Sequence, residues 1–320
     1  MTSDVGGKHV QSGTDPAMIG HSGRMPQSLR DSVEGPVTTQ DLPPGDEQWA
    51  DPYDIDITVA HPARRYNYWL GGTDNFEADR ISGDAFEQAL PTVRIAVQEN
   101  RRFLRRAVTY LVKDAGVRQF LDIGTGIPTV GNVHEVAQSL VPNSRVVYVD
   151  NDPIVLAHAR RLLTRAETGA TAYIQADLRE ADAILGHHDL QKTLDLTQPV
   201  ALMLIAVMHF FVDADDPYGH VARLAGALPP GSYLAMSHAT TDFMPADITG
   251  NLDPVVKRES ARSRDPSQLR DRAAFARFFD GMNLIEPGIA SISDWRYDDP
   301  PDGRTAAADT MAYGAVARIR

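Results

Sequence analysis

Residues Phe120–Pro128 read Phe-Leu-Asp-Ile-Gly-Thr-Gly-Ile-Pro, and this stretch decides the fold that the rest of the sequence predicts. A short apolar run ends in an acid, two glycines one residue apart follow, and a segment compatible with a helix begins at Val133. This order is typical of a buried parallel strand that leads into a helix through a loop beside a ligand. Glycine lacks a Cβ, so such a loop can approach a nucleotide-like molecule closely. An ordinary strand-to-helix turn has a similar pattern, and Thr129 stands where a strict dinucleotide fingerprint carries its third glycine.

The composition of the 320 residues limits the class of protein. A hydrophobic fraction of 42% is ordinary for a globular protein with a real core. The net charge of −12 argues against a nucleic acid as the main partner, because phosphate binding requires a basic face. The absence of cysteine excludes disulfides, thiolate metal ligands and a cysteine nucleophile. We see no apolar run near the roughly 18 residues of a membrane span and no signal-peptide core, so we expect a soluble, cytoplasmic protein without a membrane partner.

Composition and pattern divide the chain into three parts. Residues 1–50 predict a disordered N-terminal tail, because a segment rich in Gly, Ser, Pro, Asp and Gln buries too little apolar surface to offset its ordering entropy. For residues 51–116 the sequence predicts a helical lid segment. Its helices are expected to begin at Pro62 and to span about 79–89 and 92–115. Residues 117–320 predict an α/β core.

Strands alternate with helices in this core, which predicts a mostly parallel sheet with helices on both faces. The expected strands are 119–123, 145–149, 172–175, 200–205 and 231–236. The expected helices are 133–140, 154–163, 180–185, 217–228 and 272–279. Two strand-like runs, at 289–295 and 311–319, flank a loop rich in Pro, Asp and Gly and predict an antiparallel C-terminal hairpin at the sheet edge.

Polar residues and glycines gather where the expected strands end, and open α/β sheets bind their ligands there. The candidate cofactor-binding residues are Asp122, Gly124, Thr125, Gly126, Asp150, Asn151, Asp177, Leu178 and Ala206. The carboxylate of Asp150 can accept two hydrogen bonds from ribose hydroxyls. Asp177 can meet an adenine amino group, with Leu178 against the ring. Asp152 is interpreted as the N-cap of the next helix.

Several stretches together resemble the class I S-adenosylmethionine-dependent methyltransferases. They are Asp122–Gly126, Val149–Asn151, Gln175–Asp177 and Leu204–His209, closed by the terminal hairpin. More narrowly, residues 61–76, 120–128 and 147–153 look like one bacterial family of predicted S-adenosyl methyltransferases whose substrates are mostly unassigned. The resemblance covers the chain from about Asp54 to Arg320. It implies a Rossmann-like sheet with an antiparallel last strand.

The resemblance also implies that S-adenosylmethionine, or its product S-adenosylhomocysteine, binds at the strand ends. By match to the class motifs, Gly124 and Gly126 would lie against the methionine part, Asp150 would hold the ribose, and Asp177 with Leu178 would meet the adenine. The class usually has a third glycine in this loop, and Pro128 departs from that pattern. The departure bears on the path of the loop and not on the expected fold. The acceptor is expected to be a small molecule. No Asp/Asn-Pro-Pro-aromatic motif follows the fourth strand, which disfavours methylation of amides or base amino groups.

His209, after the fourth expected strand, is the candidate catalytic residue. Its position resembles that of the general base in small-molecule O-methyltransferases, and imidazole takes up a proton near neutral pH. The alternative is a histidine that packs and donates one hydrogen bond. His238 is a weaker candidate. The pair His187–His188 and the acids of Asp213–Asp216 support a metal site more weakly still, so no metal is expected.

Residues 64–76 combine aromatic, arginine and amide side chains, a mixture typical of small-molecule pockets. We expect this segment to form a lid over the strand ends. Its candidate contact residues are Tyr66, Asn67, Tyr68, Asp74 and Asn75. If the segment only packs, these side chains would instead be buried against the helix at 92–115.

Two other functions are compatible with the same sheet, because unrelated functions share folds. One is a nicotinamide-dependent oxidoreductase, which the missing third glycine and the terminal hairpin disfavour. The other is a non-catalytic S-adenosylmethionine sensor, which acceptor turnover would distinguish from an enzyme. Nothing in the sequence indicates an oligomeric state.

Overall fold

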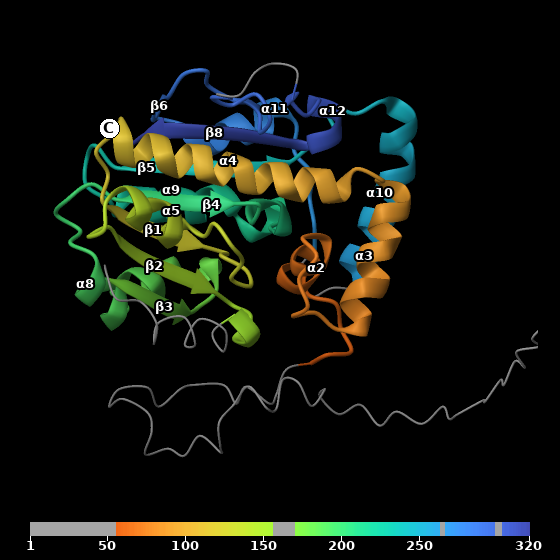
Figure 1. The fold of residues 1–320 in the computed structure, drawn as a ribbon, viewed down its shortest axis with the longest axis horizontal. Coiled ribbons are helices and arrows are strands. Elements are labelled where there is room, and N and C mark those ends of the chain that lie inside the picture. Colours follow the sequence, from red (N-terminus) through yellow and green to blue (C-terminus); the bar gives the residue numbers. More distant parts are fainter. Residues whose placement is uncertain (1–55, 156–169, 263–265, 298–302) are drawn as a thin grey trace, which may run out of the picture. The chain divides into compact units, whose positions relative to one another are not determined.

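The computed structural model describes residues 56–155, 170–262, 266–297 and 303–320 (Figure 1). The expected tail at 1–50 and most of the helix expected at 154–163 lie outside the described residues.

A single sheet carries the parallel strands that the alternation predicts. Its strands are β1 (Gln119–Ile123), β2 (Arg145–Asp150), β3 (Thr171–Gln175), β4 (Ala201–Ile205), β5 (Tyr233–Ala239), β6 (Asn283–Leu284), β7 (Ala290–Ser291) and β8 (Ala312–Arg318). They lie in the order β3-β2-β1-β4-β5-β8-β6, and β7 pairs with β8. Strands β1 to β5 are parallel, whereas β8 runs antiparallel to β5. The predicted Rossmann-like sheet with an antiparallel C-terminal strand is therefore confirmed.

Helices cover both faces of the sheet, because successive strand residues point to opposite sides and both sides are apolar. Leu121 packs in the core beneath one group of helices, and its neighbour Phe120 packs beneath the other. The first group is α7 (Ala181–Gly186), α8 (His188–Thr193), α9 (Pro217–Gly226) and α11 (Arg272–Ala276). The second is α4 (Val93–Lys113) and α5 (Val133–Leu140).

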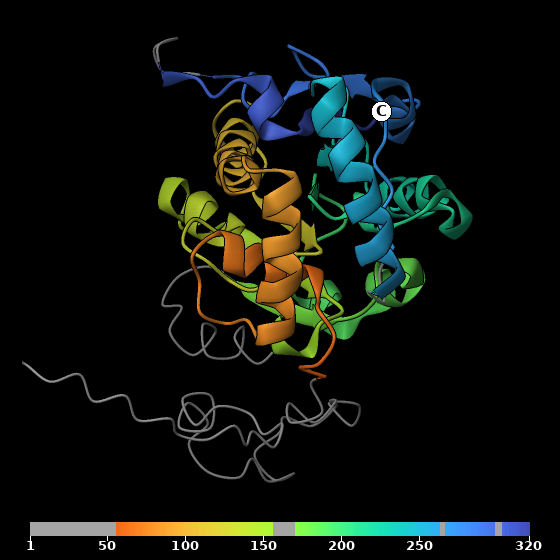
Figure 2. The same cartoon turned by 90° about the vertical axis from the view of Figure 1, so that its right-hand side faces the viewer.

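A separate set of helices lies at the carboxyl ends of the parallel strands, toward which the arrows point in Figure 1. It comprises α2 (Pro62–Trp69), α3 (Glu77–Ala89), α10 (Ala246–Arg262) and the short α12 (Ala307–Thr310). Figure 2 views this end, with α3 and α10 side by side in front of the sheet. Helix α2 begins with Pro62 after the N-cap His61, and Gly71, at φ +80°, follows its C-cap.

Two elements differ from the prediction. Residues 289–295 form only the two-residue β7 and then a turn, since Trp295 is buried against Phe103 and its carbonyl accepts a hydrogen bond from Arg106. Helix α10 was not predicted from its polar sequence, which contains Pro254. Packing overrides this weak propensity, because Leu252 is fully buried beside Leu90 and Val93.

Candidate active site

A cavity of about 250 Å³ lies at the carboxyl ends of the parallel strands, beneath α2, α3 and α4. The strand-end residues that line it are Asp122, Gly124, Thr125, Asp150, Asn151, Asp177, Leu178 and Ala206. The structure thus brings together the predicted cofactor-binding residues, except that Gly126 lies outside the lining. Its backbone N–H bonds the Asp150 carboxylate at 2.7 Å.

Gly124 lies at the point where the strand order reverses, between β1 and β4. Its φ is +73°, and a Cβ at this position would lie 2.3 Å from the Cγ2 atom of Val207, which follows β4. The Gly124 N–H donates to the carbonyl of Val149 at 2.8 Å. Any side chain at position 124 would therefore strain the backbone and force apart the loops that border the cavity.

Asp150, at the end of β2, is buried and anchors both adjoining loops. One carboxylate oxygen accepts from the N–H of Gly126 at 2.7 Å, and the other accepts from the N–H of Asp152 at 3.0 Å. Burial raises the pKa of Asp150, while these two hydrogen bonds oppose that rise. Each oxygen keeps a second lone pair that can accept a hydrogen bond from a ligand in the cavity.

Asp122 and Arg101 place opposite charges at the end of β1. Burial raises the pKa of Asp122 to about 7, with Arg101 lowering it and Asp150 raising it. Arg101 donates to the side chain of Asn132 at 3.0 Å, while its buried Nε has no hydrogen-bond partner. Such a pair of charges matches the amino and carboxylate groups of an amino acid.

At the end of β3, Leu178 is buried in the cavity wall and Asp177 is held by its neighbours. The Asp177 carboxylate accepts from the backbone N–H and the guanidinium of Arg179, and from the amide of Asn151 at 3.3 Å. These bonds fix the carboxylate at the rim of the cavity.

His209 lies in a short 3-10 turn after β4 and lines the cavity. Its Nδ1 is buried and has no hydrogen-bond partner. Burial, together with the Arg65 and Arg270 cations, lowers the pKa of His209 to about 3. The imidazole is therefore neutral at physiological pH and is a weak base.

His238, the weaker candidate, has both ring nitrogens engaged. Its Nδ1 lies 2.8 Å from the carbonyl of Ala239, to which only an N–H can donate. Its Nε2 consequently carries the lone pair that accepts from Arg270 at 3.0 Å. Burial lowers the pKa of His238 well below its usual value. These contacts give His238 a structural task and leave no free lone pair for an acceptor.

A chain of hydrogen bonds connects the loop after β4 to the lid. Ser237 Oγ accepts from the N–H of Ala206 at 3.0 Å and donates to Asn100 at 2.6 Å. Asn100 donates to the Tyr66 hydroxyl at 3.0 Å, and this hydroxyl donates to the carbonyl of Val97 at 3.1 Å. Ser237 was not predicted, since one small polar residue in an apolar strand carries no sequence signal.

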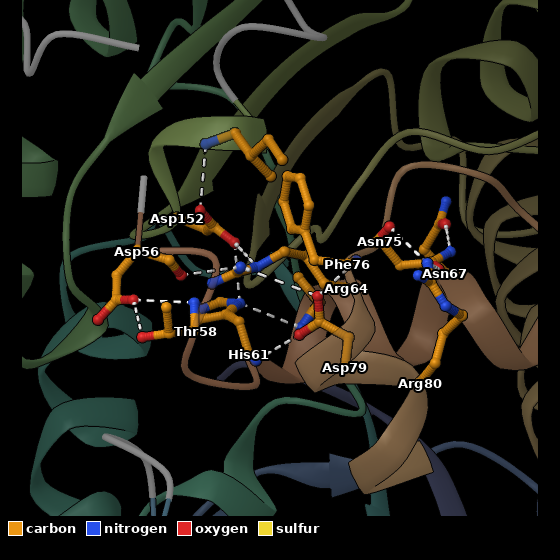
Figure 3. A network of polar contacts seen from close by, with 12 residues as sticks. Asp56, Thr58, His61, Arg64, Asn67, Asn75, Phe76, Asp79, Arg80 and Asp152 are labelled. Carbon is orange, nitrogen blue, oxygen red and sulfur yellow. Dashed lines mark hydrogen bonds and ion pairs between the residues drawn. The ribbon is translucent and has the colours of Figure 1, made fainter. Parts of the chain in front are cut away.

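Of the five side chains predicted as lid contacts, Tyr66 lines the cavity, and Arg65 and Trp69 of the same segment line it too. Asn75 donates to the side chain of Asn67 at 2.9 Å, and both amides are buried within the lid (Figure 3). Tyr68 donates to Asp84 at 2.7 Å. The cavity lining includes neither these residues nor Asp74. Asn67, Asn75 and Tyr68 therefore hold the lid together, while Arg65, Tyr66 and Trp69 are the lid residues that line the cavity.

Asp152 connects the lid to the loop that follows Asp150 (Figure 3). One oxygen of Asp152 caps the next helix through the N–H of Ile154, as predicted. The other lies 2.9 Å from His61 Nδ1 and 3.4 Å from Arg64 Nε. Burial opposes ionisation, yet His61 and Arg64 hold the pKa of Asp152 below its usual value.

The described residues also bear on a metal site and on membrane spans. Within 56–155, 170–262, 266–297 and 303–320, no three histidine or acidic side chains are grouped as metal ligands. Across the same ranges, none of the helices is both long and apolar enough to cross a membrane.

Comparison with known proteins identifies the family. A family model described as S-adenosyl methyltransferase matches residues 48–320. A solved structure of a DUF574 family protein from Streptomyces avermitilis is 47% identical, with a TM-score of 0.77, and the match covers 83% of this chain and 99% of that one. A protein from Thermobifida fusca, provisionally named a methyltransferase, is 36% identical with a TM-score of 0.75, over 83% and 97% of the two chains. No curated protein matches. The chain therefore belongs to the S-adenosyl methyltransferase family, and it is an S-adenosylmethionine-dependent methyltransferase.

Proposed function

We propose that this methyltransferase transfers a methyl group to a hydroxyl oxygen of a small molecule bound beside the cofactor. The observation that carries the proposal is the shared cavity, in which strand-end acids and the unpartnered His209 nitrogen lie beneath one lid. The lid approaches the glycine loop closely, since a Cβ at Gly126 would lie 3.9 Å from that of Ala63. A concave, mostly apolar cavity with a few polar groups favours a small acceptor over a macromolecule.

The residues present fit S-adenosylmethionine. Asp122 and Arg101 would hold the amino and carboxylate groups of its methionine part, because their charges are opposite and adjacent. Asp150 would accept from the ribose hydroxyls with its remaining lone pairs. Asp177 would meet the adenine, with Leu178 against the ring. Gly124 allows the loop its positive φ in close contact with Val207, where no side chain fits.

When bound, this cofactor supplies a methyl group already activated on a sulfonium. The chain's own residues then align the acceptor and exclude water. His209 is proposed to bind the acceptor through Nδ1. The predicted role as general base stays a prediction, and a pKa of about 3 favours positioning over proton uptake. Tyr66, held by Asn100 and Val97, would close the lid side of the cavity.

Transfer of radiolabelled methyl groups tests the proposal. The protein is incubated with methyl-labelled S-adenosylmethionine and, separately, with the small-molecule, protein and RNA fractions of one bacterial extract. We expect label in the small-molecule fraction, in products whose mass rises by one methylene and whose methyl is bonded to oxygen. Label confined to protein or RNA would contradict the proposal. Binding of the cofactor without transfer to any fraction would support the sensor instead.

A further inference from the structure

The cavity extends beyond the proposed cofactor residues to the other side of the sheet. In the strand order β3-β2-β1-β4-β5-β8-β6, Asp150 and Asp177 follow β2 and β3, near one end of the series (Figure 1). Ala239 ends β5 and pairs with Ala312, the first residue of β8, and both also line the cavity. The proposed function uses residues at the ends of β1, β2 and β3 for the three parts of the cofactor. The part of the cavity at β5 and β8 is therefore left for the acceptor.

Apolar side chains line this second part of the cavity, which we call the acceptor lobe. They come from α2, α3, α10, the segment before α11 and the residue before β8, and they pack against one cluster around Leu90 and Val93. The residues of the lobe are Trp69, Phe86, Val256, Leu269 and Met311. All five are only partly buried, so apolar surface remains open to the cavity. Clustered apolar surface in a concave site is typical of contact with a hydrophobic ligand.

Backbone hydrogen bonds hold two residues of the lobe at the ends of β5 and β8. The carbonyl of Met311 accepts from the N–H of Thr240 at 2.9 Å. Leu269 precedes Arg270, whose N–H donates to the carbonyl of Ala239 at 3.4 Å. The lobe is thereby fixed to the side of the sheet opposite β2 and β3.

Two polar side chains at the border of the lobe are turned to protein partners. The indole N–H of Trp69 donates to the carbonyl of Gly83 at 3.2 Å. The hydroxyl of Thr310, next to Met311, donates to the carbonyl of Ala307 at 2.9 Å. Trp69 therefore offers the lobe its apolar ring, and a polar ligand group there would lose hydration in exchange for apolar contacts.

Arg65, which lines the cavity beside the lobe, is also engaged within the protein. Its guanidinium lies 5.1 Å from the centre of the Phe86 ring and donates to Ser82 at 3.1 Å. Ser82 in turn donates to the buried carboxylate of Glu259 at 2.6 Å. A cation and an acid thus meet at one hydroxyl, where α2, α3 and α10 join.

His209 lies between the cofactor residues and the lobe, because it follows β4 and β4 stands between β1 and β5. Its buried Nδ1 has no hydrogen-bond partner, in contrast to the polar groups that border the lobe. A ligand hydroxyl can form a hydrogen bond with this nitrogen. The rest of such a ligand, extending away from the cofactor, would enter the lobe.

From this arrangement we propose that the methyl acceptor is an uncharged hydrophobic alcohol or phenol, whose hydroxyl binds at His209 and whose hydrocarbon rings fill the acceptor lobe. The inference rests on the proposed methyl transfer to oxygen and adds the chemical class of the acceptor. Val256 and Met311 are thus specificity-determining residues. Sugars, amino acids and nucleotides carry charges or several hydroxyls, and the lobe would leave these groups without hydrogen bonds.

Fluorescent naphthols test the inference without turnover. The protein is first loaded with S-adenosylhomocysteine and then titrated near neutral pH with 2-naphthol, 6-hydroxy-2-naphthoate and 6-(aminomethyl)-2-naphthol. The three probes share the rings and the hydroxyl, and the last two carry a negative and a positive charge at the far end. We expect 2-naphthol to bind at least about tenfold more tightly than either charged analogue, because a charge in the apolar lobe loses its hydration. Equal or tighter binding of either charged analogue would overturn the inference.

Two neighbouring valines of α10 locate the binding site. Val256 lines the lobe, whereas Val255 is also partly buried but lies outside the cavity lining. Val256→Asp should weaken the binding of 2-naphthol at least about tenfold, or about 1.4 kcal/mol, because the ligand would cover a carboxylate. Val255→Asp is the matched control and should bind 2-naphthol as wild type does. Equal affinities in the two variants would show that the rings do not occupy the lobe.

A second variant repeats the test on the β8 side of the lobe. Met311→Asn places a polar amide there, and asparagine tolerates the φ of +54° at this position. It should also weaken the binding of 2-naphthol, and an unchanged affinity would remove Met311 from this role. Binding of S-adenosylhomocysteine shows that each variant is folded. If neither lobe variant folds, the wild-type comparison of the three probes still decides.

The outcomes for the proposed function differ from these. If S-adenosylhomocysteine does not bind, the proposed function itself fails. If it binds and labelled methyl reaches the oxygen of a small molecule, while the probes show no preference for the uncharged naphthol, only the inference about the acceptor fails.

Discussion

Asp122→Asn should stabilise the free protein at neutral and alkaline pH while weakening its cofactor binding. The Asp122 side chain is buried at the end of β1, and burial raises its pKa from 3.8 to about 7. Above pH 7 the folded state must hold a buried carboxylate that the unfolded chain keeps in water. Asparagine has nearly the same shape and carries no charge, so the variant avoids this cost.

The magnitude follows from the shift. A displacement of about three pKa units corresponds to about 4 kcal/mol, at 1.36 kcal/mol per unit. Because the folded-state pKa is raised, the cost is absent below about pH 4, grows between pH 4 and 7 and is complete above pH 7. The variant should therefore match wild type near pH 4 and exceed it by up to about 4 kcal/mol at pH 8.

Urea unfolding of both proteins, without cofactor, at several values between pH 4 and 8 measures this difference. Calorimetry with S-adenosylhomocysteine then measures the opposite effect, an expected loss of about tenfold or more for one charge-assisted hydrogen bond. An Asn variant that is less stable than wild type at pH 8, or a stability difference that does not change with pH, would refute the reasoning.

Three further predictions concern the loop and the lid. Gly124→Ala should destabilise the fold by roughly 2 kcal/mol or more, since the new Cβ would lie 2.3 Å from Val207. Gly116→Ala is the control, because Gly116 has a similar φ of +72° but open space around it, and it should cost less in the same urea experiment. Equal costs would show that contact with Val207 does not cause the destabilisation. Asp152→Asn should speed hydrogen exchange across residues 61–69, because it weakens the contacts with His61 and Arg64; unchanged exchange would show that these contacts do not hold the lid. S-adenosylhomocysteine should protect the lid residues 64–76 together with the glycine loop, and protection of the loop alone would contradict the lid.

Local sequence patterns predicted the bounds of those helices and strands whose stability depends on residues within the element itself. Strand Gln119–Ile123 and helix Val133–Leu140 have the predicted bounds. The strand is one buried apolar run before a glycine turn, and the helix begins with a capping box formed by Asn132 and Glu135. Helix α10 could not be predicted, because Leu252 and its partners in distant segments stabilise a sequence interrupted by Pro254.

The residues of the candidate site likewise include some that local sequence patterns predict and some that they do not. The strand-end residues were predictable, because alternation of strands and helices places all these ends at one edge of the sheet. The lid contacts were not, since the packing of α2 against α3 decides which of its side chains face the cavity. Tyr66 faces it, whereas Tyr68 turns to Asp84 on α3. The bond from Ser237 to Asn100 joins residues 137 positions apart, which no local pattern shows.

Calorimetric titration of wild type and Asp150→Ala with S-adenosylhomocysteine, and of wild type with NADH, tests the central claim most directly. We expect wild type to bind S-adenosylhomocysteine at one site and not to bind NADH. Asp150→Ala should remain folded and bind S-adenosylhomocysteine about 1–3 kcal/mol more weakly, the range for losing hydrogen bonds to a charged group. Tight binding of NADH without binding of S-adenosylhomocysteine, or an affinity that Asp150→Ala leaves unchanged, would contradict it.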